Sequence, residues 1–116
     1  MTPAQIDHFR HKLLAMRADL LRELAAIPAL DAAGDGREGD QTDQSSAETD
    51  RDLIALNRAR ADQRLNEVDR ALVRIDNGSY GICEETGRPI GLKRLEARPT
   101  ATLSIEAQEE RERLAR

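Results

Sequence analysis

Aromatic side chains are nearly absent from this chain, which has one Phe, one Tyr and no Trp among its 116 residues. Without large rings, a chain of this length cannot build the thick core of a typical globular domain. Instead, 34% of the residues are charged. They alternate with Leu and Ala at helical spacing, a composition typical of long helices or coiled coils. We therefore predict a mainly α-helical, elongated protein.

Long apolar runs are also missing. No stretch approaches the roughly 20 apolar residues that a membrane-spanning helix needs, and residues 1–10 do not resemble a secretory signal peptide. The single cysteine, Cys83, excludes an internal disulfide and fits a reducing compartment. We expect a cytoplasmic protein without membrane contact, and its net charge of −4 disfavours direct, specific DNA binding.

The N-terminal part of the chain has the pattern of one amphipathic helix. Thr2 is a suitable N-cap residue and Pro3 fits the first helical position. Apolar residues follow at spacings of three and four: Ile6, Phe9, Leu13, Met16, Leu20, Leu24 and Ile27. Pro28 then ends or kinks the helix. The apolar stripe indicates that one face of this helix is buried.

A second helix is expected to begin between Asp43 and Ser46, both good N-cap residue types, and to run to about Asp76. Its apolar stripe repeats every seven residues, as in a coiled coil. The stripe comprises Ile54, Ala61, Val68 and Ile75, with Leu65 and Leu72 beside them. Asn77 and Gly78 are typical helix-terminating residues.

The connection between the two helices is rich in glycine and acidic residues. Three glycines within residues 34–39 interrupt helical structure. Residues 1–77 therefore read as a long antiparallel coiled-coil hairpin with its tip near residues 34–45. Residues 31–50 contain seven acids and one base, a net charge of −6, whereas the rest of the chain sums to +2. Such a tip suits contact with a cation, a bound metal or a basic cleft.

Residues 78–116 form the second predicted segment. It starts with a small hairpin or knuckle, in which glycines alternate with apolar residues over residues 80–91. A short helix is expected over residues 92–97, and Ser104 is a suitable N-cap for a final helix. Five aliphatic side chains are candidates for its apolar cluster: Ile82, Ile90, Leu92, Leu95 and Leu103.

His8 and His11 lie three residues apart near the start of the first helix, close to the spacing of metal ligands. No cysteine or Glu-x-x-His pattern completes a site around them. We interpret both as solvated polar residues of the helix.

The second segment also contains specific motifs: Tyr80-Gly81-Ile82-Cys83, Gly87-Arg88-Pro89-Ile90 and Arg94-Leu95-Glu96-Ala97-Arg98-Pro99-Thr100-Ala101. Together they resemble the C-terminal zinc-finger signature of the DksA/TraR family, whose members regulate bacterial transcription by binding RNA polymerase. The order of hairpin, acidic tip, finger and terminal helix also matches this family. The resemblance implies a transcription regulator rather than an enzyme. The chain indeed shows no nucleophile, base and orienting group at a recognisable spacing.

The family's finger holds zinc with four cysteines, of which this chain retains one. The matching positions are Cys83, Thr86, Ser104 and Ala107. A structural zinc site requires four thiolate or imidazole ligands. We therefore expect no zinc, and the chain resembles the zinc-free members of the family. Cys83 is interpreted as a small buried core residue rather than a catalytic thiol or a redox sensor.

The resemblance also implies roles for residues of the tip. Family members have an Asp-x-x-Asp-x-Ala pattern there, and this chain has Asp40 and Asp43 followed by Ser45 in place of the alanine. The resemblance implies that the hairpin enters the secondary channel of the polymerase. The two aspartates would then act near the active site and alter open-complex stability. The alternative is that they belong to a solubilising loop.

Members of the family also respond to guanosine tetraphosphate, the alarmone of the stringent response, which binds between regulator and polymerase. Arg98 matches a basic position of that site, and Asn57 and Arg60 match hairpin positions implicated in polymerase contact. Glu67 and Gln108 stand where lysines are expected, and a glutamate repels phosphates, so a weakened response is anticipated. Four basic residues still form a patch at the finger: Arg88, Lys93, Arg94 and Arg98.

The sequence thus favours a monomeric regulator whose partner is bacterial RNA polymerase. Two alternatives stay open. One is a paralogue that binds polymerase without the full regulatory effect. The other is a coiled-coil adaptor or homodimer that uses the heptad stripes. A zinc-dependent DNA-binding protein is disfavoured by the missing ligands.

Overall fold

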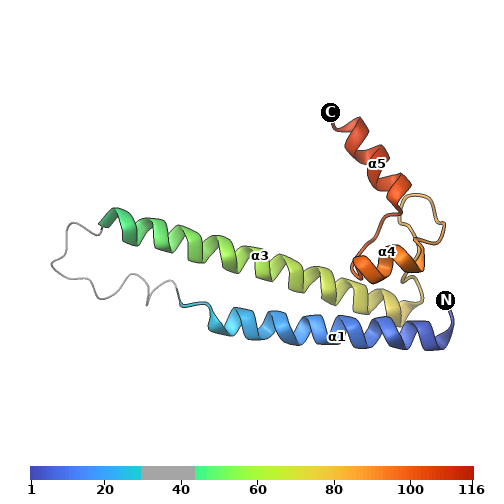
Figure 1. Ribbon diagram of the computed structural model, residues 1–116, viewed down its shortest axis with the longest axis horizontal. Coiled ribbons are helices and arrows are strands. Elements are labelled where there is room, and N and C mark those ends of the chain that lie inside the picture. The colour runs from blue at the N-terminus through green and yellow to red at the C-terminus, as the bar shows by residue number, and fades with distance from the viewer. Residues whose placement is uncertain (30–43) are drawn as a thin grey trace. The chain divides into compact units, whose positions relative to one another are not determined.

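The structure is a computed structural model that describes residues 1–29 and 44–116. In these residues it contains α1 (Pro3–Ala26), α3 (Gln44–Asn77), α4 (Leu92–Ala97) and α5 (Ile105–Leu114) (Figure 1). The predicted positions of all these helices are confirmed. None of the described helices is long and apolar enough to cross a membrane.

A capping box starts α1. The hydroxyl of Thr2 accepts a hydrogen bond from the backbone N–H of Gln5 at 3.1 Å, while Oε1 of Gln5 accepts from the N–H of Thr2 at 2.9 Å. The two bonds satisfy N–H groups that have no partner within the helix. Pro3, which has no N–H to satisfy, is the first residue of the helix, as predicted.

A left-handed glycine ends α3. Gly78 has a φ of 82°, a conformation that glycine adopts without steric cost. The turn allows the N–H groups of Ser79 and Tyr80 to donate to the carbonyl of Arg74 at 2.9 and 3.1 Å. These bonds satisfy a carbonyl that the last helical turn would otherwise leave without a partner.

The chain packs as two compact units, of which the first comprises Met1–Arg17 and Glu67–Arg116. In this unit α1 runs antiparallel to α3, because Arg10 pairs with Asp76 at 4.0 Å and Arg17 with Asp69 at 2.8 Å. Seven residues forward on α1 correspond to seven residues back on α3, the register of a heptad seam. Buried on this seam are Phe9, Leu13, Val68, Ala71 and Ile75.

The second unit comprises Ala18–Asn66. Leu20 and Ala61, which belong to the two predicted stripes, are buried in it. The guanidinium of Arg58 donates to the carbonyl of Ile27 at 3.4 Å, so α3 supplies a partner for a carbonyl just after α1. The two units cut across both long helices. The sequence instead predicts a division between residues 77 and 78, where the helical hairpin ends. That division stays a prediction.

Between α3 and α4 the chain forms a small knuckle, as predicted. Ile82 and Pro89 make an isolated antiparallel bridge. The N–H of Cys83 donates to the carbonyl of Arg88 at 2.8 Å, and the N–H of Gly87 donates to the carbonyl of Cys83 at 2.9 Å. The knuckle is therefore a tight turn closed by backbone hydrogen bonds on both sides of Cys83.

The predicted apolar cluster of this segment is partly wrong. Ile90, Leu95 and Leu103 are buried, but Ile82 and Leu92 are 41% and 42% exposed. Ile82 lies between the buried residues Gly81 and Cys83, but its own side chain faces solvent. Leu92 is the first residue of α4, and Leu95, one turn later, occupies the inward face. Four smaller or polar-tipped residues complete the cluster: Tyr80, Cys83, Ala101 and Ala107.

Tyr80 links the knuckle to the rest of the first unit. Its hydroxyl donates to the carbonyl of Pro99 at 2.7 Å, and its ring lies 5.8 Å from the ring of Phe9. Burial raises the pKa of Tyr80 to about 12. The phenol therefore stays protonated and keeps this hydrogen bond throughout the physiological pH range.

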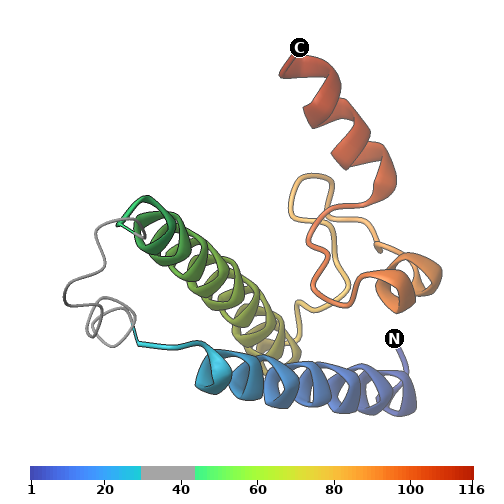
Figure 2. The same ribbon diagram turned by 60° about the vertical axis from the view of Figure 1, so that its left-hand side comes forward.

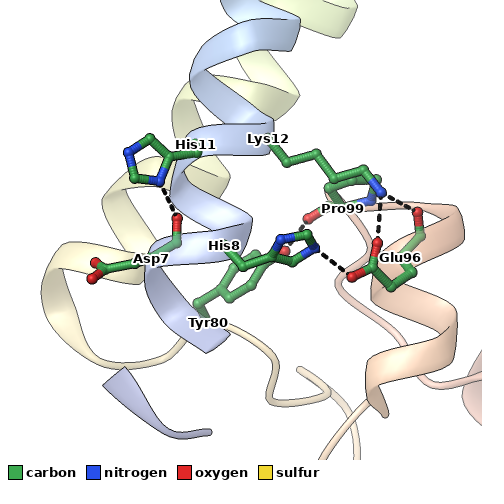
Figure 3. Close-up of polar contacts among 7 residues, drawn as sticks. All are labelled: Asp7, His8, His11, Lys12, Tyr80, Glu96 and Pro99. Atoms are coloured by element: carbon green, nitrogen blue, oxygen red, sulfur yellow. Dashed lines mark hydrogen bonds and ion pairs between the residues drawn. The ribbon is translucent and has the colours of Figure 1, made fainter. Parts of the chain in front are cut away.

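A polar contact joins α1 to α4 (Figure 3). Glu96 bonds to the imidazole of His8, and Lys12 Nζ donates to both the carboxylate and the backbone carbonyl of Glu96, at 2.8 and 2.7 Å. The hydrogen bond from Lys12 is the largest cause of a lowered pKa at Glu96. His11 bonds to the carbonyl of Asp7. Both histidines are exposed, and within the described ranges no cluster of His, Cys, Asp and Glu suits a metal ion.

We expect Leu95→Ala to lower the free energy of unfolding by about 2–4 kcal/mol, because it leaves a cavity at a side chain that is 1% exposed. Urea denaturation followed by circular dichroism measures the change. Leu92→Ala, on the same helix but 42% exposed, is the matched control and should cost about 0.5 kcal/mol or less. Equal losses in the two variants would contradict this account of the core.

Candidate functional site

The predicted tip residues fall at the edge of what the structure describes. Asp40 and Asp43 lie outside the described residues, and their roles stay predictions. Ser45 belongs to the first turn of α3. Asn57 and Arg60 lie further along α3 and are both exposed, three residues apart and therefore on one face of the helix.

The four finger positions are brought together in the first unit. Cys83 is 1% exposed, as expected of a buried residue. Its sulfur is hydrogen-bonded to the Thr86 side chain and to the backbone of Ser104. Ser104 caps α5, because its Oγ accepts from the N–H of Ala107 at 3.2 Å, and this predicted cap is confirmed. The positions of the family's zinc ligands thus form one local cluster.

The electrostatics of Cys83 were not foreseen from the sequence. The hydrogen bond with the Thr86 side chain, followed by that with the Ser104 backbone, lowers the pKa of Cys83 to about 6. These bonds outweigh desolvation, which acts in the opposite direction. The donors of Thr86 and Ser104 therefore shift Cys83 towards the thiolate form.

These residues do not fit a structural zinc ion. Tetrahedral zinc sites use four ligands of the cysteine, histidine or carboxylate type. Cys83 offers one thiolate, Thr86 and Ser104 offer neutral hydroxyls that already serve in hydrogen bonds, and Ala107 offers no ligand atom. The donor set therefore favours a knuckle held by packing and hydrogen bonds.

We expect a chelator to leave the thermal unfolding of this protein unchanged. By contrast, the triple variant T86C/S104C/A107C should bind one zinc ion per chain and gain thermal stability, because its four thiols would come from positions that are already close together. Metal analysis of the purified proteins and melting curves with and without chelator measure both outcomes. Stoichiometric zinc in the unmodified protein would contradict the expectation.

A pocket of about 240 Å³ opens elsewhere in the first unit. It brings together Arg98, Glu67 and Gln108, three residues that the sequence resemblance assigned to one site although they are up to 41 positions apart. Six charged residues line it: Glu67, Arg70, Arg74, Glu84, Arg94 and Arg98. Four guanidinium groups against two carboxylates leave the lining with a formal charge of +2, which suits an anionic ligand or surface.

The arginines Arg70 and Arg74 of this pocket were missed from the sequence. Together with Glu67 they lie at positions i, i+3 and i+7 of α3, and this spacing is the signal that could have found them. Arg74 Nη2 is buried and, among the described residues, has no hydrogen-bond partner. A buried charged donor without a partner is costly, so a bound anion at this pocket would be favoured.

The predicted basic patch at the finger is divided by the structure. Arg94 and Arg98 line the pocket, and Arg94 Nε is fixed by donating to the carbonyl of Leu103 at 2.8 Å. Arg88 and Lys93 are exposed and do not line it. The patch therefore supplies two residues to the pocket and two to the surrounding surface.

This architecture defines a class: an antiparallel helical hairpin joined to a zinc-finger-like knuckle and a terminal helix. Two family models together span nearly the whole chain. "DnaK suppressor protein DksA, N-terminal domain" matches residues 5–75, and "Prokaryotic dksA/traR C4-type zinc finger" matches residues 78–113. The chain belongs to the DksA/TraR family.

Individual relatives agree with this assignment. The chain is similar to the RNA polymerase-binding transcription factor DksA of Caulobacter vibrioides, with 47% identity over 116 residues, which cover 100% of this chain and 82% of that protein. The factor of the same name from Escherichia coli is 32% identical, over 93% of this chain and 72% of that protein. The solved structure of transcription factor DksA2 from Pseudomonas aeruginosa has a TM-score of 0.89 and 40% identity, covering 99% of this chain and 88% of that chain.

Proposed function

We propose that this protein is a transcription regulator that binds bacterial RNA polymerase. The observation that carries the proposal is the similarity, along the whole chain, to a polymerase-binding transcription factor with 47% identity. The hairpin lies in the part of the chain that matches the family's N-terminal domain, and the knuckle and terminal helix lie in the part that matches its zinc finger. The protein would act in the cytoplasm as a monomer, without catalysing a reaction itself.

The acidic tip is the proposed effector. The hairpin would enter the secondary channel of the polymerase and bring Asp40 and Asp43 close to the active site. There the carboxylates would make charge-assisted contacts with basic residues or with groups around the catalytic metal. The net charge of −6 over residues 31–50 supports a contact with a positive surface.

The finger is proposed to work without zinc. Burial of Leu95, the capping of α5 by Ser104 and the hydrogen bonds around Cys83 supply contacts that hold the knuckle. In a metal-bound finger, zinc contributes much of the folding free energy of so small a segment. A metal-independent regulator would keep its fold when zinc is scarce.

We expect Asp43→Asn to abolish the effect on transcription while leaving polymerase affinity within about twofold, because it removes one charge at the tip and keeps the side-chain shape. In vitro transcription from a ribosomal RNA promoter, with purified polymerase, measures the effect. A competition binding assay with the same preparation measures affinity. Asp62→Asn, an exposed acid on the arm of the hairpin, is the control and should behave like the unmodified protein. A large loss of binding in Asp43→Asn would contradict the effector role.

The pocket around Arg98 is the proposed alarmone contact, and Glu67 is expected to weaken it. A carboxylate in the lining repels the phosphates of guanosine tetraphosphate and offsets part of the attraction of the arginines.

The double variant E67K/Q108K replaces the repulsion of the phosphates by attraction. It should therefore lower the concentration of guanosine tetraphosphate that is required for the joint effect by about tenfold. Transcription assays with and without the nucleotide measure it. E67K/Q108K combined with Arg98→Ala should lose the gain. An unchanged response in E67K/Q108K would show that the pocket does not contact the nucleotide.

A second candidate is a paralogue that binds polymerase without the full regulatory effect. Ser45, in place of the alanine of the family's tip pattern, is the observation that favours it. In the transcription assay this candidate would compete with an active regulator and have no effect alone.

A further inference from the structure

The end of α3 carries an asparagine that is followed by glycine, Asn77 and Gly78. The other two asparagines of the chain, Asn57 and Asn66, lie inside α3 and are followed by large side chains. Asn77, Gly78 and Ser79 are all exposed, so this turn is open to water. Of the three asparagines, Asn77 alone precedes a residue without a side chain.

The backbone nitrogen of Gly78 is weakly held. Its N–H donates to the carbonyl of Ile75 at 3.4 Å, which is longer than an ordinary N–H···O bond. Apart from the two adjacent residues, no atom of the described residues lies within 4 Å of the position that a Cβ on Gly78 would occupy. The nitrogen is therefore an accessible nucleophile once it has lost its proton.

Ser79 holds the side chain of Asn77 beside this nitrogen. Oδ1 of Asn77 accepts from the backbone N–H of Ser79 at 3.0 Å and from the Ser79 hydroxyl at 2.6 Å. A bond from an asparagine side chain to the backbone two residues ahead forms an Asx turn, which folds the side chain over the peptide unit between them. Cγ of Asn77 is thereby kept on the side of Gly78, and its carbonyl oxygen faces two donors.

We propose that Asn77 is a site of spontaneous deamidation, with the nitrogen of Gly78 as nucleophile and Ser79 as an assisting group. Hydroxide removes the proton of the Gly78 N–H, and the nitrogen forms a bond to Cγ of Asn77. The bond from Cγ to Nδ2 breaks, and the leaving nitrogen takes a proton from water and departs as ammonia. A succinimide ring remains, which water opens at either carbonyl to give aspartate or isoaspartate. The net reaction consumes one water, releases one ammonia and involves no oxidation or reduction.

Ser79 assists because negative charge develops on Oδ1 of Asn77 as the nitrogen attacks. Donors that are already aimed at such an oxygen stabilise the transition state more than the ground state. By contrast, the N–H groups that follow Asn57 and Asn66 take part in the hydrogen bonds of α3. The structure therefore favours the reaction at the end of the helix and opposes it within the helix.

Either product changes the end of α3. It adds a carboxylate beside Asp76, at the negative end of the helix dipole. Isoaspartate also lengthens the main chain by one carbon, inside the turn where the N–H groups of Ser79 and Tyr80 donate to the carbonyl of Arg74. Tyr80 in turn anchors the knuckle through its bond to Pro99. Deamidation should therefore loosen the connection between α3 and the knuckle, whether or not the protein binds a partner.

The test is to incubate the full chain in warm, mildly alkaline buffer and to follow each asparagine by peptide mass spectrometry. Asn77 should deamidate while Asn57 and Asn66 stay intact. Ser79→Ala removes one of the two donors and should slow the reaction about three- to tenfold, whereas Ser79→Thr keeps a hydroxyl and should react as the parent does. In urea, where the turn is lost, the Ser79→Ala variant and the parent should react at the same rate. Equal rates of these two proteins in the folded state, or an intact Asn77, would overturn the proposal.

The effect on the fold has its own readout. The isoaspartate form, separated by chromatography, should melt several degrees below the parent when circular dichroism follows unfolding. The variant N77D carries the new charge on a normal main chain and is the matched control, so it should lose less. An isoaspartate form that melts with the parent would overturn the proposed loosening of the connection.

Discussion

The first unit depends on a small core of tightly packed side chains. Phe9, Cys83 and Leu95 are 1% exposed, and the hydroxyl of Tyr80 fixes the loop after α4 through Pro99. In so short a segment a structural metal would normally supply much of the stability. The residues at the four finger positions do not fit a zinc ligand set, and burial of apolar area contributes to the stability of this segment. Beside parts of the long helices, the first unit contains α4, α5 and the loops next to them (Figure 1, Figure 2).

Cys83 shares one electrostatic feature with the cysteines of a zinc finger, namely hydrogen-bond donors around its sulfur. In metal sites, thiolates are stabilised by hydrogen-bond donors around them as well as by the ion. Here such donors lower the pKa of the thiol. Ser104 serves twice, since its backbone bonds to Cys83 and its hydroxyl caps α5. The start of α5 is therefore tied to the knuckle by the same residue that replaces a family cysteine.

Function would be distributed over two differently charged parts of the protein. Acidic residues gather at positions 31–50, which the sequence places at the tip. The pocket around Arg98 combines four arginines with two glutamates. Because the two parts share no residue, the regulatory effect and the response to the nucleotide can change independently.

The sequence by itself determined the helices, their ends and their buried stripes. Caps such as Thr2 and Ser104 and the stop at Gly78 depend on hydrogen bonds between residues that are close in the chain, and heptad spacing depends on helical geometry alone. The family motifs of the finger likewise predicted which positions match the family's zinc ligands, because ligand spacing is also local. These signals required no knowledge of which segments meet.

Only the tertiary structure decided which distant residues share a surface. The contact of His8 and Lys12 with Glu96 joins residues more than 80 positions apart. The inward position of Leu95 rather than Leu92 likewise depends on how α4 packs, and so does the pocket that adds Arg74 to Arg98. Spacing along one element says nothing about the orientation of another. Burial and pairing across elements follow from packing, whose free energy is a property of the whole fold.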